Sequence, residues 1–131
     1  MSEHVTESGC HCGAVRFRVV LHEPIQAHAC NCSICVASGF VGVIIPEQQF
    51  TLLQGEASLS EYRFNTGVAR HLFCRHCGVK SFYRPRSNPD GVSINANLLS
   101  LPEGVAIEQH AFDGQHWEAH AHTLKHLTGE S

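Results

Sequence analysis

The chain has 131 residues, of which 43% are apolar and 16% charged, a balance that suits one globular domain with a modest core and excludes a disordered chain. Its formal net charge of −3 argues against binding nucleic acid through a basic surface. The longest apolar run, 40–46, is too short to span a bilayer. The polar N-terminus lacks the apolar core of a secretory signal, so we expect a cytoplasmic protein with reduced thiols.

Short strands separated by turns account for most of the predicted structure. The first strand, 14–21, places Val15, Phe17 and Val19 on one face and its two arginines on the other, which is the period-two pattern of a half-buried strand. Apolar or alternating runs and turn residues then predict five more strands, at 40–45, 50–53, 59–64, 68–73 and 80–83, with turns at 65–67 and 86–91.

The last predicted strand, 92–98, alternates apolar residues with Ser93, Asn95 and Asn97, so we expect these polar residues on the opposite face from Val92 and Ile94. Beyond it, the apolar positions from Trp117 to Leu127 approximate one helical stripe and predict a short helix over about 116–127. The sequence therefore predicts a mainly β protein, 1–131 in a single domain, that ends in a short helix.

Seven cysteines fall into three clusters, and an odd number cannot be used up by disulfides alone. The clusters are Cys10 and Cys12, then Cys30, Cys32 and Cys35, then Cys74 and Cys77. Clustered thiols in a reducing compartment indicate a metal site, and tetrahedral zinc is the usual occupant. Residues two apart in an extended segment project to the same side, and a Cys-x-x-Cys pair followed by glycine suits a tight knuckle around an ion.

The spacing favours a division of four plus three. Two cysteine pairs would close a structural zinc site, whereas three cysteines within six residues would leave one zinc position open, as in catalytic sites. Other divisions stay open: two of the middle cysteines can join Cys74 and Cys77, and His28, His71 or His76 can complete the three-cysteine site. A redox-active Cys-x-x-Cys pair is a further alternative.

The cysteine clusters and their flanking residues resemble the family of glutathione-dependent formaldehyde-activating enzymes and centromere protein V. The resemblance extends from Ser8 to about Glu118, and the segments that carry it are 8–17, 30–40, 70–78, 81–85 and 87–95. It implies an Mss4-like sandwich of small antiparallel sheets with zinc knuckles. It also implies a structural zinc bound by Cys10, Cys12, Cys74 and Cys77, and a second, catalytic zinc bound by Cys30, Cys32 and Cys35.

The activity that the resemblance implies is a carbon–sulfur lyase reaction on S-(hydroxymethyl)glutathione, formed from glutathione and formaldehyde, or on another thiol–aldehyde adduct. Two zinc ions per chain and a small-molecule thiol such as glutathione are the implied cofactors and ligand. A non-enzymatic zinc module that binds protein or nucleic acid is the alternative, although the acidic balance of the chain disfavours nucleic acid.

Glutathione carries two carboxylates, so cationic and polar residues are expected near the second zinc. The candidates are Arg70, Lys80, Arg84, Arg86 and Asn95. The histidine pairs His116/His120 and His122/His126 have helical i, i+4 spacing, but their residue order does not match a zinc-protease motif. We interpret them as solvated surface side chains.

Overall fold

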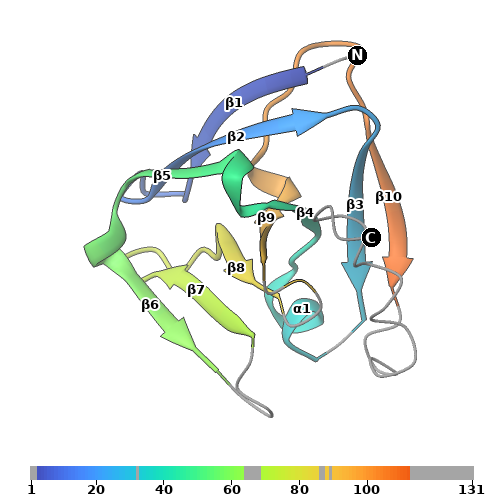
Figure 1. Cartoon of the computed structure of the whole chain (residues 1–131). Coiled ribbons are helices and arrows are strands. Elements are labelled where there is room, and N and C mark those ends of the chain that lie inside the picture. The colour runs from blue at the N-terminus through green and yellow to red at the C-terminus, as the bar shows by residue number, and fades with distance from the viewer. Residues whose placement is uncertain (1–2, 32, 64–68, 86–87, 89, 113–131) are drawn as a thin grey trace.

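The computed structural model describes residues 3–31, 33–63, 69–85, 88 and 90–112. Within these ranges the protein is mainly β and forms two sheets (Figure 1). A three-stranded sheet has the order β1-β2-β5, and a seven-stranded sheet has the order β10-β3-β4-β9-β8-β7-β6. The predicted helix at 116–127 and the predicted turn at 65–67 lie outside the described residues. None of the helices in the described ranges is long and apolar enough to cross a membrane.

The strands of the first sheet are β1 (Glu3–Gly9), β2 (Arg16–His22) and β5 (Phe50–Gln54). Those of the second are β3 (Ile25–Cys30), β4 (Gly42–Pro46), β6 (Leu59–Tyr62), β7 (Arg70–Cys74), β8 (Phe82–Arg84), β9 (Gly91–Asn95) and β10 (Ile107–Phe112). Helix α1 (Ser33–Ser38) and three short 3-10 turns, η1 (Glu47–Gln49), η2 (Glu56–Ser58) and η3 (Ala96–Leu98), complete the described elements. Strand pairing is antiparallel except between β3 and β10, which run parallel.

The core lies between the two sheets. As predicted, the apolar face of β2 is buried, and Phe17, Val19 and Leu21 are each no more than 1% exposed. They pack against the apolar residues of one face of the seven-stranded sheet: Ile25, Ala27, Val43, Ile45, Leu72, Phe82, Val92 and Ile94. Phe50 joins the sheets, since its ring centroid lies 5.9 Å from that of Phe17 and 4.6 Å from that of Phe82.

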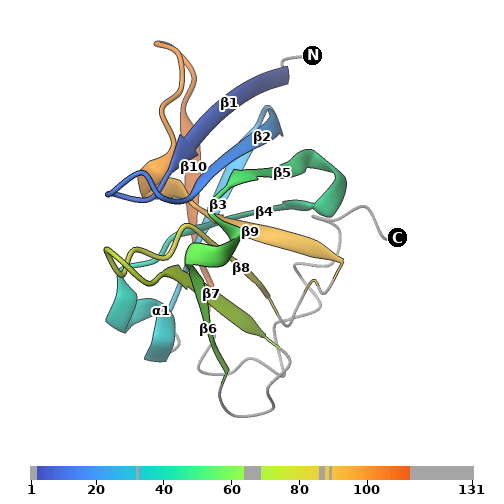
Figure 2. The same ribbon diagram turned by 90° about the vertical axis from the view of Figure 1, so that its left-hand side faces the viewer.

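The other face of the seven-stranded sheet, which we call the outer face, points away from the three-stranded sheet. Helix α1 lies on the side remote from β1 and β2 in both views (Figures 1 and 2). The expected polar face of β9 proves to be buried as well, with Ser93 2% and Asn95 8% exposed. The outer face is therefore partly covered, and its polar residues are held inside the protein.

Candidate metal centre

Two turns, which hold the first and third cysteine clusters, bring four cysteines together. Cys10 and Cys12 lie in the turn between β1 and β2, whereas Cys74 ends β7 and Cys77 lies in the turn that follows it. Their four sulfurs all lie within 4.8 Å of one another, and the Cys12 sulfur is 3.7 Å from the sulfurs of both Cys10 and Cys74. The structure thus pairs the first and third cysteine clusters rather than the second and third.

A glycine in the left-handed region follows each pair. Gly13 has φ +84°, and its N–H donates to the carbonyl oxygen of Cys10 at 3.1 Å. Gly78 has φ +77°, and its N–H donates to the carbonyl oxygen of Cys74 at 2.8 Å. Residues with a Cβ rarely adopt this conformation, so glycine lets each turn close immediately after its second sulfur.

The backbone also prepares the sulfurs for a cation. The N–H groups of Cys12 and Val79 lower the pKa of the Cys77 thiol to about 6. The N–H groups of Cys77 and His76 lower the pKa of the Cys74 thiol. At Cys12 the N–H of Ala14 acts in the same direction, but desolvation and the three neighbouring thiols outweigh it and raise the pKa to about 11. Four thiols this close cannot all lose their protons unless a cation offsets the charge.

The geometry fits zinc. Zinc–sulfur bonds of about 2.3 Å in a tetrahedron place the sulfurs about 3.8 Å apart, close to the 3.7 Å found here. Cys10 and Cys74 are buried, and Val15, which is fully buried, packs against both. Among the described residues, these four cysteines are the one group of three or more potential ligands close enough to hold an ion. Four thiolates fill the tetrahedron, so such a site is structural.

The middle cluster lies elsewhere. Cys30 ends β3 and packs against Ile44 and Phe112, Cys35 is buried in α1, and Cys32 lies outside the described residues. Strand register shows on which face Cys30 lies. Its partner on β10 is Phe112, and Ile44, which it contacts, lies on the same face of the sheet as Ser93 of β9. These residues alternate with the core residues, so Cys30 belongs to the outer face.

Lys80 and Asn95 also lie on the outer face. Lys80 Nζ lies 2.8 Å from Nδ1 of His71 and packs over the ring of Tyr83, which is opposite Ser93. Asn95 is opposite Gly42, and its Nδ2 donates to the carbonyl oxygen of Lys80 at 2.9 Å. Both sequence candidates therefore share a sheet face with Cys30.

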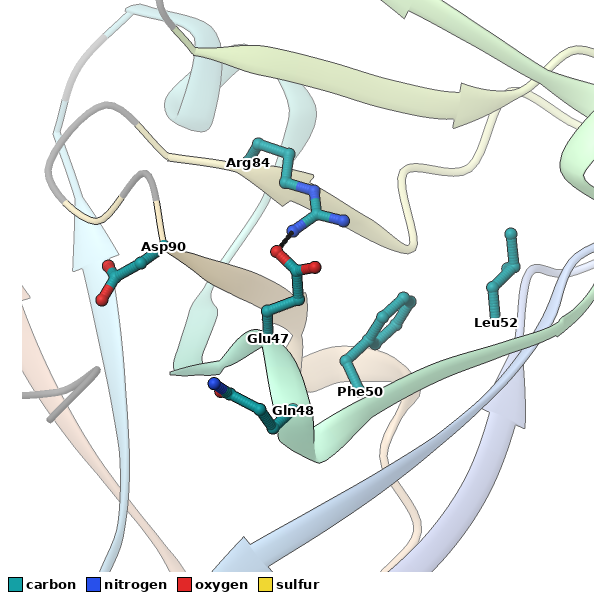
Figure 3. Close-up of a pocket in the computed structure, with 6 residues that line it drawn as sticks. All are labelled: Glu47, Gln48, Phe50, Leu52, Arg84 and Asp90. Carbon is teal, nitrogen blue, oxygen red and sulfur yellow. Dashed lines mark hydrogen bonds and ion pairs between the residues drawn. The ribbon is translucent and has the colours of Figure 1, made fainter.

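Arg70 and Arg84 lie on the other face. They are register partners, next to the core pair Leu72 and Phe82, and each forms an ion pair with a glutamate. Arg84 binds Glu47 at 2.9 Å across an open pocket of about 540 Å³ (Figure 3). The other lining residues are Gln48, Phe50, Leu52 and Asp90. None of the described cysteines lines this pocket, and the predicted substrate contacts of both arginines stay predictions. Arg86 lies outside the described residues.

No histidine ring among the described residues joins the group of four sulfurs. The Nδ1 of His71 faces Lys80, and the rings of His28 and His110 lie side by side on β3 and β10 with centroids 5.7 Å apart. His76 contributes its backbone N–H to the sulfur of Cys74. The four C-terminal histidines lie outside the described residues.

Sequence reasoning missed Phe40 and Tyr83, whose rings enclose Lys80. Phe40 was assigned to a strand, but the strand begins two residues later because the N–H of Phe40 bonds the carbonyl oxygen of Cys35 at 3.1 Å. The position of Tyr83 beside Lys80 depends on the long-range register of β8 and β9, which the sequence does not reveal.

Comparisons with known proteins agree with the cysteine pattern. The family model described as "Glutathione-dependent formaldehyde-activating enzyme" matches residues 5–115. A protein of Halomonas elongata that carries the name of a glutathione-dependent formaldehyde-activating enzyme is 30% identical over 114 residues, which cover 77% of this chain and 73% of that protein. A crystal structure of a Rhodobacter sphaeroides protein superposes with a TM-score of 0.70 at 29% identity, covering 80% of this chain and 100% of that one.

Proposed function

This chain belongs to the family of glutathione-dependent formaldehyde-activating enzymes, and from this premise we propose that it is a zinc-dependent carbon–sulfur lyase. Its substrate class is a thiol–aldehyde adduct of the S-(hydroxymethyl)glutathione type, with glutathione or another small thiol as the partner. The proposal includes a reducing, cytoplasmic setting, since the thiols must stay available for metal and ligand.

Two zinc ions per chain are part of the proposal. Cys10, Cys12, Cys74 and Cys77 would hold the structural ion, and Cys30, Cys32 and Cys35 would hold the second. Held by these three cysteines, a zinc ion with an open position would supply a lowered thiol pKa and Lewis acidity toward an oxygen of the adduct. Three thiolates give such a site a net negative charge, which favours thiol chemistry over activation of water.

The residues of the outer face would bind and orient the substrate. Lys80 and Asn95 lie on the same face as Cys30, whereas Arg70 and Arg84 carry glutamate partners on the other face. We therefore assign the substrate's polar contacts first to Lys80 and Asn95. The buried setting of both residues lowers the local dielectric and strengthens such contacts.

The observation that carries this proposal is the cluster of four cysteine sulfurs. These four account for one ion, and the spacing of Cys30, Cys32 and Cys35 supports a second, open site. Metal analysis of protein purified without added zinc tests the division. We expect more than one equivalent of zinc per chain, whereas a firm single equivalent, with Cys30, Cys32 and Cys35 all freely alkylated, would contradict the second site.

Activity is tested on S-(hydroxymethyl)glutathione by following formaldehyde release. We expect turnover by the wild-type protein and none by Cys32→Ser, which should keep its fold and its structural zinc. Wild-type protein with two zinc ions and no turnover on any thiol–aldehyde adduct would instead favour the non-enzymatic zinc module.

A further inference from the structure

The four-cysteine cluster is open to solvent at one of its sulfurs. Cys10 and Cys74 are only 5% and 1% exposed, and the fully buried Val15 packs against both. Cys77 is half-buried, whereas Cys12 is exposed. A reagent in solvent therefore reaches the cluster first at Cys12. Exposure matters here because it is one of the two properties that make a cysteine susceptible to oxidation, the other being thiolate character.

The exposed sulfur lies beside a sulfur from the other half of the cluster. The Sγ of Cys12 is 3.7 Å from the Sγ of Cys10 and 3.7 Å from that of Cys74. A bond to Cys10, two residues earlier in the chain, would close a small ring in which a disulfide is strained. Cys74 comes from a separate turn, so a bond to it closes no such ring. The geometry thus makes Cys74 the better partner for an oxidised Cys12.

We propose that Cys12 is an oxidation site, at which hydrogen peroxide converts the four-cysteine cluster into a Cys12–Cys74 disulfide. As a metal ligand Cys12 is a thiolate, the form that attacks peroxides. It attacks one peroxide oxygen, the O–O bond breaks and hydroxide leaves, which gives a sulfenic acid. The Cys74 thiolate then attacks the Cys12 sulfur, the S–O bond breaks and a second hydroxide leaves. The two sulfurs together lose two electrons, and the peroxide takes up both.

The disulfide would replace the metal ion as the link between the two turns. Two of the four ligands would be lost, so Cys10 and Cys77 alone could not form a closed zinc site. The new bond would join residues 62 apart in the sequence, and such a cross-link restricts the unfolded chain. Two equivalents of a small thiol would reduce the bond and leave as their own disulfide. The cluster would thus lose its ion reversibly and keep its fold, a role separate from the proposed lyase reaction.

Peptide mapping of the zinc-loaded protein after an equimolar amount of hydrogen peroxide tests the site. Free thiols are blocked with N-ethylmaleimide, and trypsin then cuts after Arg75, between the two cysteines of the third cluster. We expect peptide 1–16, linked through Cys12, to be joined to peptide 71–75. Zinc release to a chromophoric chelator should rise in step with this disulfide, and dithiothreitol with added zinc should restore the original melting temperature.

Cys77→Ser is the matched control for Cys12→Ser, because each variant loses one ligand of the cluster. Cys77→Ser keeps the reacting pair and should still form the Cys12–Cys74 disulfide. In Cys12→Ser, peroxide should oxidise Cys74 at least about tenfold more slowly than in the control. The inference is wrong if the first disulfide of the cluster joins any other pair, if its four thiols stay reduced, or if Cys74 is oxidised equally fast in both variants. Should either variant fail to fold, the peptide map of the wild type decides.

Discussion

Gly13 and Gly78 occupy equivalent places in the two halves of the four-cysteine cluster. Each follows the second cysteine of its pair, and each N–H returns to the carbonyl oxygen of the first cysteine. The spacing differs, with one residue between Cys10 and Cys12 and two between Cys74 and Cys77. The two pairs thus differ in spacing, but the same glycine hydrogen bond closes both turns. The cluster needs both glycines to bring its sulfurs within reach of one ion.

Cys74→Ser should destabilise the protein by removing a ligand from the buried side of the cluster. Structural zinc contributes folding free energy directly, so we expect a loss of about 3 kcal/mol or more, or roughly a 10 °C drop in melting temperature. Differential scanning calorimetry with zinc analysis measures both effects. Cys30→Ser, outside the cluster, is the matched control. If Cys74→Ser melts no lower than the control, the cluster has no structural role.

Zinc binding to the metal-free cluster should release protons, that of Cys12 among them. With a pKa of about 11, the Cys12 thiol is protonated at neutral pH, whereas Cys77, at about 6, is already ionised. Zinc must therefore displace the Cys12 proton, and its apparent affinity should rise about tenfold per pH unit for each proton released. Competition with a chromophoric chelator at pH 6.5 and 7.5 measures this, and equal affinities at the two pH values would refute the assignment.

The ion pairs of Glu61 predict a shift that titration can detect. The hydrogen bond from Arg70, 2.8 Å from Nη2 to Oε1, and a second contact from Arg63 hold the pKa of Glu61 below its ordinary value of 4.5. A lowered pKa means that the pair stabilises the fold above that ordinary value, and that this contribution disappears as the pH falls through the lowered pKa. Arg70→Met should raise the pKa of Glu61, as measured by NMR titration, whereas Arg18→Met should not.

At the scale of elements, β4 and β9 show what a residue pattern can and cannot reveal. The apolar run at 40–46 predicted a strand, and β4 is indeed buried on both faces. The alternation in 92–98 predicted a strand with a polar face opposite Val92 and Ile94. The strand ends at Asn95, residues 96–98 form η3, and all five residues of β9 are buried, the polar face included. The reason is that Phe40 folds back over the outer face, a contact that no local pattern encodes.

Gly42→Ala should weaken this packing. A Cβ at Gly42 would lie 2.2 Å from the hydroxyl oxygen of Ser93 and 3.0 Å from Cε2 of Phe40, so the neighbouring strand and the ring would both have to move. Overpacking of this kind costs about 1–3 kcal/mol, as equilibrium denaturation would show. The double variant Gly42→Ala/Ser93→Ala removes the closer clash and should recover part of the loss. If the double variant is no more stable than the single one, Ser93 is not the cause.

The strands and the helix that the sequence did not predict are β1, β3, β10 and α1. Strands β3 and β10 pair in parallel across a long stretch of sequence, a contact that local residue patterns do not reveal. Helix α1 has only six residues, which is too short for a periodic signal. The two local pairs, Cys10 with Cys12 and Cys74 with Cys77, could be predicted from their spacing, but spacing alone left open which pairs share an ion. The ring contacts of Lys80 could not be predicted, because His71 and Tyr83 come from separate strands that only the sheet register aligns.

Across the whole molecule, one chain of hydrogen bonds joins the two cysteine regions. The knuckle closes through Cys74 N–H to the carbonyl oxygen of Val79 at 3.0 Å, and the next residue, Lys80, accepts from Asn95. Asn95 Oδ1 accepts the N–H of Asn97 at 3.0 Å. Asn97 Nδ2 then donates to the carbonyl oxygen of Gly39, just after α1, at 3.1 Å. The position of Cys35 is thereby tied to that of the four-cysteine cluster.

Asn97→Ala should loosen α1 without disturbing the cluster, because it removes only the last bond of this chain. A side-chain hydrogen bond contributes about 1 kcal/mol, so local opening around Cys35, now 4% exposed, should become about fivefold more frequent. Alkylation with iodoacetamide, followed by mass spectrometry, would then label Cys35 about fivefold faster, while the rates at Cys74 and Cys77 stay as in the wild type. Equal acceleration at all three thiols would indicate general unfolding, and no acceleration at Cys35 would show that α1 is held by packing alone.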